Sequence, residues 1–210
     1  MAAYNSATLS AIDRSAGIVA IKPATIPIEE LRPEKIVIAD MTGNLSQNIL
    51  KPSPQLQTHL EIYKHFDAVN SICNTYSHYA TMWTQSCNEI PCFGSQAAEY
   101  FYGFIPVTES LAKTEIQDDY QANIGKAIVK RFEKLNPDQM PAVLAASIGP
   151  YTWGKTAAKA VEIAIALESV AKTAFGTVML NERQKPISLE MLQEHYNQAN
   201  TANPWEASVS

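Results

Sequence analysis

One stretch of the chain matches a motif that binds nucleotide phosphates. Residues 149–156 read Gly-Pro-Tyr-Thr-Trp-Gly-Lys-Thr, which fits the pattern GxxxxGKT at every fixed position. The stretch follows a run at 142–146 that predicts a short buried strand, and it precedes a long helical pattern, as a phosphate-binding loop does. Nucleotide binding at Gly149 to Thr156 is therefore one hypothesis for the function of this chain.

The chemistry of the same residues argues against a phosphate loop. Such a loop surrounds the anion with successive backbone N–H groups, and it needs small residues so that the anion can approach. Pro150 has no N–H, and Tyr151 and Trp153 are bulky. No later apolar strand ends in an Asp that could hold Mg²⁺. A strand-to-helix turn with a buried Trp153 is the better interpretation.

Histidines and cysteines, which could bind a metal or act as nucleophiles, are few and scattered. They are four histidines and three cysteines: His59, His65, His78, His195, Cys73, Cys87 and Cys92. The odd cysteine count at irregular spacing favours a reducing compartment, and Cys87 and Cys92 lack the CxxC spacing of a zinc knuckle. A site that uses Cys73, His78 and a carboxylate stays open as an alternative, although positions on a strand and then a helix argue against convergence.

Length and charge limit the class of protein. The 210 residues favour one domain over residues 1–210, with a core that needs neither disulfide nor metal. Sixteen basic residues face 21 acidic ones, and no basic stripe is present, so we expect no nucleic-acid partner. The start has no apolar leader and no run reaches the ~20 apolar residues of a membrane span, so we expect a cytoplasmic protein.

Apolar periodicity predicts strands and helices in alternation, hence an α/β or α+β class. The expected strands are 17–22, 35–39, 68–73 and 142–146, and the expected helices are 58–66, 77–87, 119–135, 156–180 and 189–198. Ser77 is a candidate N-cap. The expected core residues of the longest helix include Val161, Ile165, Val170, Ala174 and Val178.

Several motifs, taken in order, resemble those of one family. Residues 147–155 read SIGPYTWGK, residues 94–103 read GSQAAEYFYG, and residues 19–23 read VAIKP. They resemble the SHGPFxWGK segment, the YFYG segment and an early strand of L-ribulose-5-phosphate 4-epimerases, which are members of the class II aldolase/adducin-head superfamily. Further matches at 12–14, 115–120, 140–144 and 194–196 fall in the order of the family.

This resemblance implies a three-layer α/β/α fold with a largely antiparallel central sheet, and a cyclic homotetramer with active sites between neighbouring subunits. In such enzymes three histidines hold a divalent metal, usually zinc, which polarises the carbonyl of the substrate and stabilises an enediolate. Family members also carry a helix before the first strand, so the domain is expected to be shortened at its N-terminus.

Carried over position by position, the resemblance implies that the zinc ligands are gone. The His-Thr-His-Ser of the family corresponds to residues 74–77, which read Asn-Thr-Tyr-Ser, and the His of Ser-His-Gly-Pro corresponds to Ile148. A catalytic zinc needs three good ligands and one open position. Asn74 offers a weak neutral oxygen, Tyr76 must lose a proton to bind a metal, and Ile148 offers nothing. We therefore expect no metal and no cofactor.

Supporting positions of the site are partly replaced as well. In the phosphate-binding segment Ser53 is retained, but Gln55 stands where the family has an acid; Lys22 is retained next to a lost Ser-Gly pair. Near the C-terminus Glu206 replaces one of two tyrosines. Asp119 matches the catalytic acid of the family and is explained equally by a second role, the N-cap of the helix that follows.

The residues support three hypotheses. The first is a pseudoenzyme, a catalytically inactive homologue of L-ribulose-5-phosphate 4-epimerase that serves as a structural, scaffold or regulatory subunit of a homotetramer or larger protein assembly, as the adducin head does by analogy. No membrane span and no small-molecule substrate are expected in this case. The second is a sugar-phosphate epimerase or aldolase with altered or metal-free chemistry. The third is nucleotide binding at the GxxxxGKT stretch.

Overall fold

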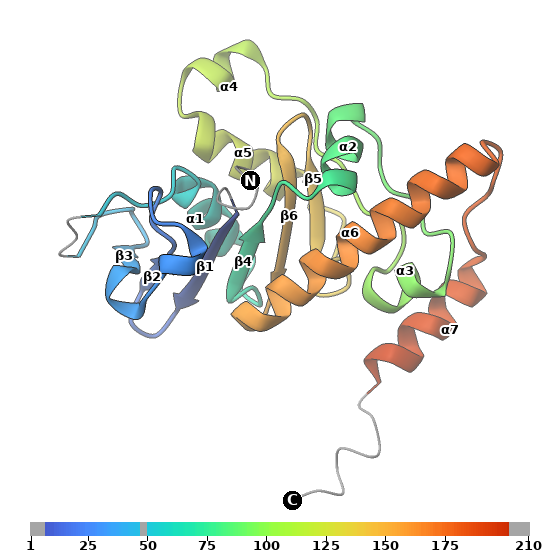
Figure 1. Ribbon diagram of the computed structural model, residues 1–210, viewed down its shortest axis with the longest axis horizontal. Coiled ribbons are helices and arrows are strands. Elements are labelled where there is room, and N and C mark those ends of the chain that lie inside the picture. The colour runs from blue at the N-terminus through green and yellow to red at the C-terminus, as the bar shows by residue number, and fades with distance from the viewer. Residues whose placement is uncertain (1–6, 47–49, 202–210) are drawn as a thin grey trace, which may run out of the picture.

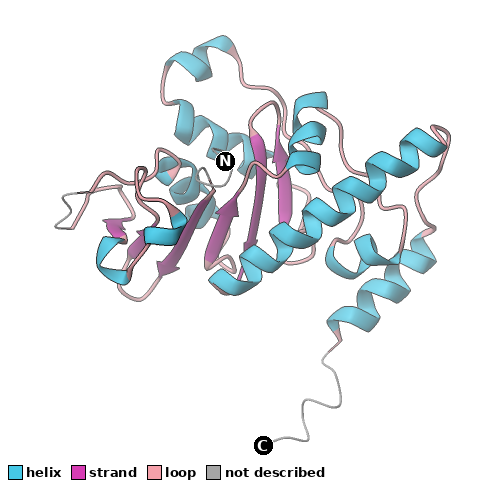
Figure 2. Ribbon diagram, in the orientation of Figure 1, coloured by secondary structure: helices cyan, strands magenta, loops and turns pink. Residues whose placement is uncertain are grey.

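The computed structural model describes residues 7–46 and 50–201 and is built on one six-stranded sheet (Figures 1 and 2). The strands are β1 (Thr8–Asp13), β2 (Ile18–Ile21), β3 (Val37–Asp40), β4 (Ser71–Asn74), β5 (Ala142–Ala145) and β6 (Gly149–Gly154). They lie in the order β3-β2-β1-β4-β6-β5, and each neighbouring pair is antiparallel.

Helices cover both faces of this sheet (Figure 1). Helices α1 (Leu56–His65) and α5 (Tyr120–Arg131) pack together on one face, and the long α6 (Ala157–Leu180) crosses β4 and β6 on the other. The remaining helices are α2 (His78–Ser86), α3 (Ser95–Tyr100), α4 (Lys113–Gln117) and α7 (Leu189–Asn200). The predicted three-layer α/β fold with an antiparallel sheet is confirmed.

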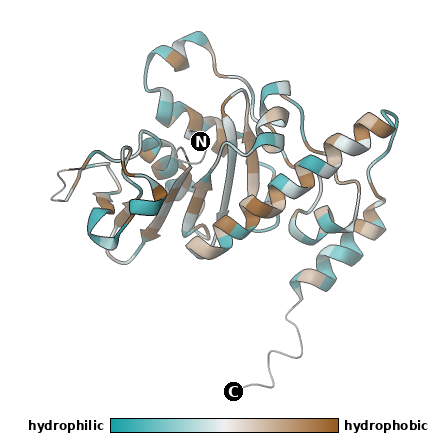
Figure 3. Ribbon diagram, viewed as in Figure 1, coloured by the Kyte–Doolittle hydropathy of each residue, from teal (hydrophilic) through white to brown (hydrophobic). Residues whose placement is uncertain are grey.

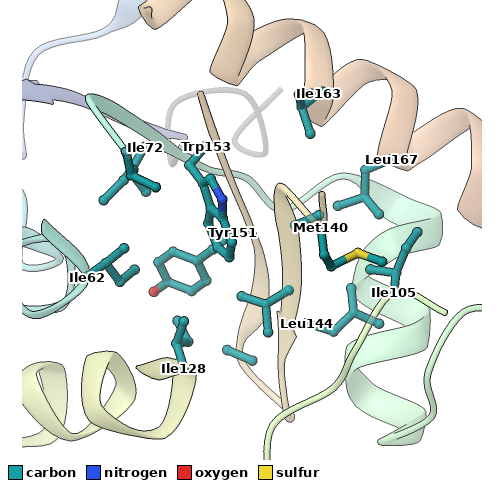
Figure 4. Packing of buried hydrophobic residues seen from close by; sticks show 14 of the residues in the cluster. Ile62, Ile72, Ile105, Ile128, Met140, Leu144, Tyr151, Trp153, Ile163 and Leu167 are labelled. Carbon is teal, nitrogen blue, oxygen red and sulfur yellow. The ribbon is translucent and has the colours of Figure 1, made fainter. Parts of the chain in front are cut away.

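The core sits on both sides of β6 (Figure 4). On the side of α1 and α5, Trp153 is 2% exposed and its ring lies against Phe66 and Phe132, with centroids 5.6 and 5.1 Å away. The indole Nε1 donates a hydrogen bond of 2.9 Å to the carbonyl of Pro137. A buried indole whose N–H has a hydrogen-bond partner adds a large buried apolar area without leaving a polar group unsatisfied. The expectation of a buried Trp153 is confirmed.

Strands β1 and β6 were not predicted from apolar periodicity. Residues 149–154 were interpreted as a strand-to-helix turn, but they form a strand paired with β4 on one side and β5 on the other. Pro150 has no N–H to donate to a neighbouring strand. It is tolerated because it lies near the start of the strand, and its carbonyl still accepts a hydrogen bond from Thr75 N at 3.3 Å. Tertiary pairing overrides local propensity here.

Helix α6 lies where a helix was predicted, but two of its expected core residues lie on its exposed face. Val170 and Ala174 are buried, whereas Val161 and Ile165 are exposed and Val178 is only half-buried. The face against the sheet is rich in alanine, including Ala160, Ala164 and Ala171. Small side chains let the helix approach the sheet closely, so the larger apolar residues are displaced to the outside.

By length and composition α6 is also apolar enough to cross a bilayer. This differs from the expectation that no segment meets that test. One of its faces packs on the sheet, and a single helix of this kind is weak evidence for a membrane span.

Helix α2 begins after Ser77, as predicted, but the serine side chain makes no capping bond. The carboxylate of Glu168 on α6 takes that role instead, accepting from Tyr79 N at 3.0 Å and Ala80 N at 2.9 Å. A carboxylate beside a helix N-terminus is favoured by the helix dipole. Helices α3 and α4 were not predicted, since they span only six and five residues.

The contact between α1 and α5 depends on Gly125. A Cβ at this position would lie 2.5 Å from Glu61 Cβ and 2.9 Å from the carbonyl oxygen of Thr58, so there is no room for a side chain. We predict that Gly125→Ala lowers the free energy of unfolding by about 1–3 kcal/mol. Gly176→Ala, a control in α6 with open space, should raise it by up to about 1 kcal/mol. Urea unfolding measures both; similar effects of the two changes would contradict this packing.

Candidate functional site

Three positions singled out in the sequence gather at the ends of β4 and β6. Asn74 is the last residue of β4 and pairs with Tyr151 of β6. A Cβ placed on Gly149, the residue after Ile148, would lie 3.5 Å from Asn74 Nδ2 and 3.9 Å from Tyr76 Cε1. Asn74 and Tyr76 therefore lie close to Gly149, and Ile148 is its neighbour in the chain.

The side chains at this place are poor metal ligands. Asn74 is fully buried, and its Nδ2 donates a hydrogen bond of 3.0 Å to the carbonyl of Pro150. Tyr76 is 40% exposed, and the side chain of Ile148 holds only carbon. Over residues 7–46 and 50–201, no group of three or more His, Cys, Asp or Glu side chains is arranged to hold a metal ion.

That finding also covers the alternative site with Cys73 and His78. Cys73 is buried on the opposite face of the sheet against Ala160 and Ala164, and burial raises the pKa of its thiol to about 11. His78 is exposed at the start of α2. The described part of the chain does not assemble this alternative.

A row of polar side chains runs across the sheet from the same point. Thr8, Asn74 and Tyr151 are register partners on β1, β4 and β6, so their side chains share one face of the sheet. All three are buried, and the hydroxyls of Thr8 and Ser53 are joined by a hydrogen bond of 2.9 Å. Burial, more than the nearby Tyr76, raises the pKa of Tyr151 and keeps its phenol neutral.

The predicted phosphate-binding residues lie beside this row. Ser53 N donates to the carbonyl of Lys22 at 3.2 Å, and Gln55 N donates to Ser53 Oγ at 3.4 Å. Lys22 is buried, which lowers its pKa, and its Nζ donates to the carbonyl of Pro23 at 3.2 Å. Lys22, Ser53 and Gln55 therefore lie close together. Thr8 connects them to Asn74, because it is hydrogen-bonded to Ser53 and is the register partner of Asn74.

His59 is a buried residue of this region to which the sequence assigned no role. Its Nδ1 and Ser10 Oγ are joined by a hydrogen bond of 2.7 Å, and Ser10 Oγ also bonds Tyr63 OH at 2.7 Å. Complete burial lowers the pKa of His59 to about 3, so the imidazole is neutral at ordinary pH. Four buried atoms here have no hydrogen-bond partner within the described ranges: His59 Nε2, Asn74 Oδ1, Gln55 Oε1 and Tyr151 OH.

Asp119 occupies the N-cap of α5. Its carboxylate accepts from Ala122 N at 3.4 Å, so the predicted capping role is confirmed. The next residue, Tyr120, lies near enough to Tyr151 to raise the pKa of that phenol slightly, although burial is the main cause. Glu206 lies outside the described residues.

The GxxxxGKT stretch is not a loop. The backbone of residues 149–154 is committed to the ladders with β4 and β5, so it cannot wrap around a phosphate. Thr156 is the N-cap of α6 and accepts from Lys159 N at 3.1 Å. Nucleotide binding through this stretch has no support in the geometry.

Comparison with known families settles the ancestry. Residues 1–175 match the model of the Class II Aldolase and Adducin N-terminal domain. The chain belongs to this family. The match includes the strands that carry Thr8, Asn74 and Tyr151.

Solved structures share the class II aldolase fold. An L-fuculose 1-phosphate aldolase superposes with a TM-score of 0.78 at 22% identity, covering 94% of this chain and 87% of the other. YgbL from Klebsiella pneumoniae gives 0.70 at 21% identity, covering 91% and 88%. An aldolase II superfamily protein from Pseudomonas syringae gives 0.75 at 12% identity, covering 97% and 80%. At these identities the likeness concerns the fold.

Sequence reasoning found the three positions around Asn74 through the resemblance, but it missed the polar row as a unit. Thr8, Asn74 and Tyr151 lie on three strands, and β6 was not recognised as one of them. The available signal was the presence of polar residues inside otherwise apolar strands, since buried polar groups need partners that only a tertiary contact supplies.

The neutral state of buried His59 predicts a pH dependence of stability. Because the unfolded histidine titrates near its ordinary pKa of 6.5 and the folded one near 3, the unfolded state binds the extra proton in between. Stability should fall as pH drops below 6.5, by at most about 1.4 kcal/mol per pH unit. Urea unfolding between pH 7.5 and 4.5 measures the slope, which His59→Asn should reduce. A matched change at exposed His65, His65→Asn, should give a steeper slope than His59→Asn does. Equal slopes in the two variants would contradict the assignment of the pH dependence to His59.

Proposed function

We propose that this chain is a non-catalytic member of the class II aldolase family, similar to L-ribulose-5-phosphate 4-epimerase, that acts as a structural or regulatory subunit of a cytoplasmic protein assembly. The observation that carries the proposal is the set of side chains at 74, 76 and 148. Asn, Tyr and Ile stand together where the family places three metal-binding histidines.

The side chains present do not fit a catalytic zinc. A zinc site of this kind needs three N, S or carboxylate donors at about 2.0–2.3 Å and one open position. Asn74 could offer only a neutral amide oxygen, Tyr76 offers a phenol, and Ile148 has no donor atom. We derive no catalytic step through a metal here.

The retained framework supports a structural role. The family match extends over residues 1–175, and the sheet that would carry the site is complete, with β4 buried along its whole length. A subunit that is selected for assembly has to keep the packing of its fold, but it does not have to keep the metal ligands.

A second candidate is a sugar-phosphate epimerase or aldolase with metal-free chemistry. It is favoured by four buried polar atoms in or beside the polar row that lack partners among the described residues: Asn74 Oδ1, Tyr151 OH, Gln55 Oε1 and His59 Nε2. Unsatisfied buried polar atoms are costly, and they concentrate at sites that bind something polar. Turnover of a ketose phosphate in the presence of a strong chelator would favour this candidate over the first.

Restoring the histidines tests the proposal. We predict that the triple variant Asn74→His, Tyr76→His, Ile148→His gains about one tightly bound Zn²⁺, because the strand register holds the three positions together. The double variant Asn74→His, Tyr76→His is the matched control and should bind far more weakly, since it supplies only two of the three ligands. Zinc titration against a chelator of known affinity measures both.

Two results would contradict the account. If the triple variant bound no more zinc than the double variant, the three positions would not form the site. If the unchanged chain converted L-ribulose 5-phosphate or L-fuculose 1-phosphate at an enzymatic rate, with or without added zinc, the non-catalytic role would be wrong.

A further inference from the structure

An apolar groove lies between the sheet and the N-terminal half of α6, and the proposed function does not use it. Its volume is about 710 Å³, within the ~300–1,000 Å³ of sites that bind small molecules. Figure 3 shows strongly apolar segments along α6 where it crosses the front of the molecule. The apolar residues that border the groove come from β1, the 28–36 segment and α6, and they include Leu9, Ala11, Ile28, Leu31, Val161 and Ile165.

The polar side chains that border the groove gather at one end of it. Strand β4 ends beside Thr8, and the chain continues from there to Thr75 and Ser77. Lys22 lies at the same end, because its N–H donates to the carbonyl of Leu9, the neighbour of Thr8, at 3.1 Å. The groove is therefore polar at this end and apolar along the rest of its length.

The polar end is complementary to an anion. Among the described residues that border the groove, Lys22 carries the only positive charge and Glu168 the only negative one. The Glu168 carboxylate already accepts from Tyr79 N at 3.0 Å and Ala80 N at 2.9 Å, at the start of α2. Burial disfavours the charged form of Lys22 and lowers its pKa, so an anion beside it stabilises the ammonium.

The dimensions of the groove fit a hydrocarbon chain. The groove extends along α6 from Ala157 to Glu168, eleven residues of helix or about 16 Å. An extended chain of roughly twelve carbons and its head group has this length, since three single bonds reach about 3.5 Å. Such a chain needs no hydrogen-bond partner from the apolar walls.

The same dimensions argue against a peptide in the groove. A helix is about 10 Å wide, so 710 Å³ holds only about six of its residues, too few for a stable helix. An extended peptide would bury its backbone N–H and C=O groups against apolar walls that offer them no partner.

We propose that the groove binds a free fatty acid, with its hydrocarbon chain along α6 and its carboxylate beside Lys22. Ser77 at the same end can donate to this carboxylate, because its hydroxyl accepts from Thr75 Oγ1 at 3.3 Å and makes no capping bond to α2. The inference goes beyond the proposed function and does not depend on whether the chain is catalytic.

Calorimetric titration of the unmodified chain with laurate, below its micelle concentration, tests the proposal. We expect one laurate per chain. Octanoate, which is four methylenes shorter, should bind at least about tenfold more weakly, because each buried methylene strengthens binding by up to about fourfold. An absence of saturable laurate binding, or equal affinities for the two acids, would overturn the proposal.

The wall of the groove is tested by Ile165→Asp. This change should weaken laurate binding at least about tenfold, because it places a charge in the apolar wall. Ile116→Asp on α4 is the matched control and should leave the affinity within about twofold. Both isoleucines are exposed, at 68% and 52%, and circular dichroism checks that both variants are folded. Equal effects of the two changes would place laurate elsewhere and overturn the proposal.

The place of the carboxylate is tested on the unmodified chain and on one variant. Dodecylamine has the chain of laurate with a positive head group, and it should bind at least about tenfold more weakly, although the net charge of −5 favours a cation. Lys22→Met should weaken laurate about tenfold and leave 1-dodecanol within about twofold. Dodecylamine binding as tightly as laurate, or equal losses for laurate and dodecanol, would contradict the proposal. Binding to phosphatidylglycerol vesicles without binding of free laurate would also overturn it.

Discussion

The pairing of β4 with β1 and β6 is the constraint on which the rest of the structure depends. All four residues of β4 are buried, and the strand is held on both edges by antiparallel ladders. This pairing fixes where the chain leaves the sheet after Asn74 and where it enters at Gly149, because the ladder bonds join backbone groups. The positions of the site residues are therefore set by hydrogen bonds that do not depend on what those side chains are.

This separation is what the proposed non-catalytic role requires, because the fold then does not depend on the side chains of the site. Asn74 is compatible with a buried strand because its amide N–H finds a partner at the carbonyl of Pro150. Tyr76 lies at the surface, where substitution has little effect on stability, and Ile148 packs against the core with its apolar side chain. Under the proposed function these three side chains preserve the fold, and the domain acts through its surfaces.

Much of the architecture could be predicted from the sequence, and the failures have physical causes. Long apolar periodicity located α1, α5 and α6, and the ordered motifs indicated the three-layer fold. Strand β6 was missed because its Gly and Pro suggest a loop, whereas two neighbouring strands stabilise it. The burial of α6 was misjudged because alanine was undervalued: Ala160, Ala164 and Ala171 face the sheet while Ile165 faces outward. The polar row stayed hidden because its members, such as Thr8 and Tyr151, meet only through sheet register.

The metal content of the unchanged protein tests the central claim most directly. The chain is produced in zinc-supplemented medium, freed of loosely bound metal by gel filtration, and analysed by elemental mass spectrometry. The account predicts far less than one zinc per chain, because Asn74, Tyr76 and Ile148 supply no set of three good ligands. About one zinc per chain, lost when Asn74 and Tyr76 are changed to Ala, would contradict it and return the protein to the metal-dependent enzymes of its family.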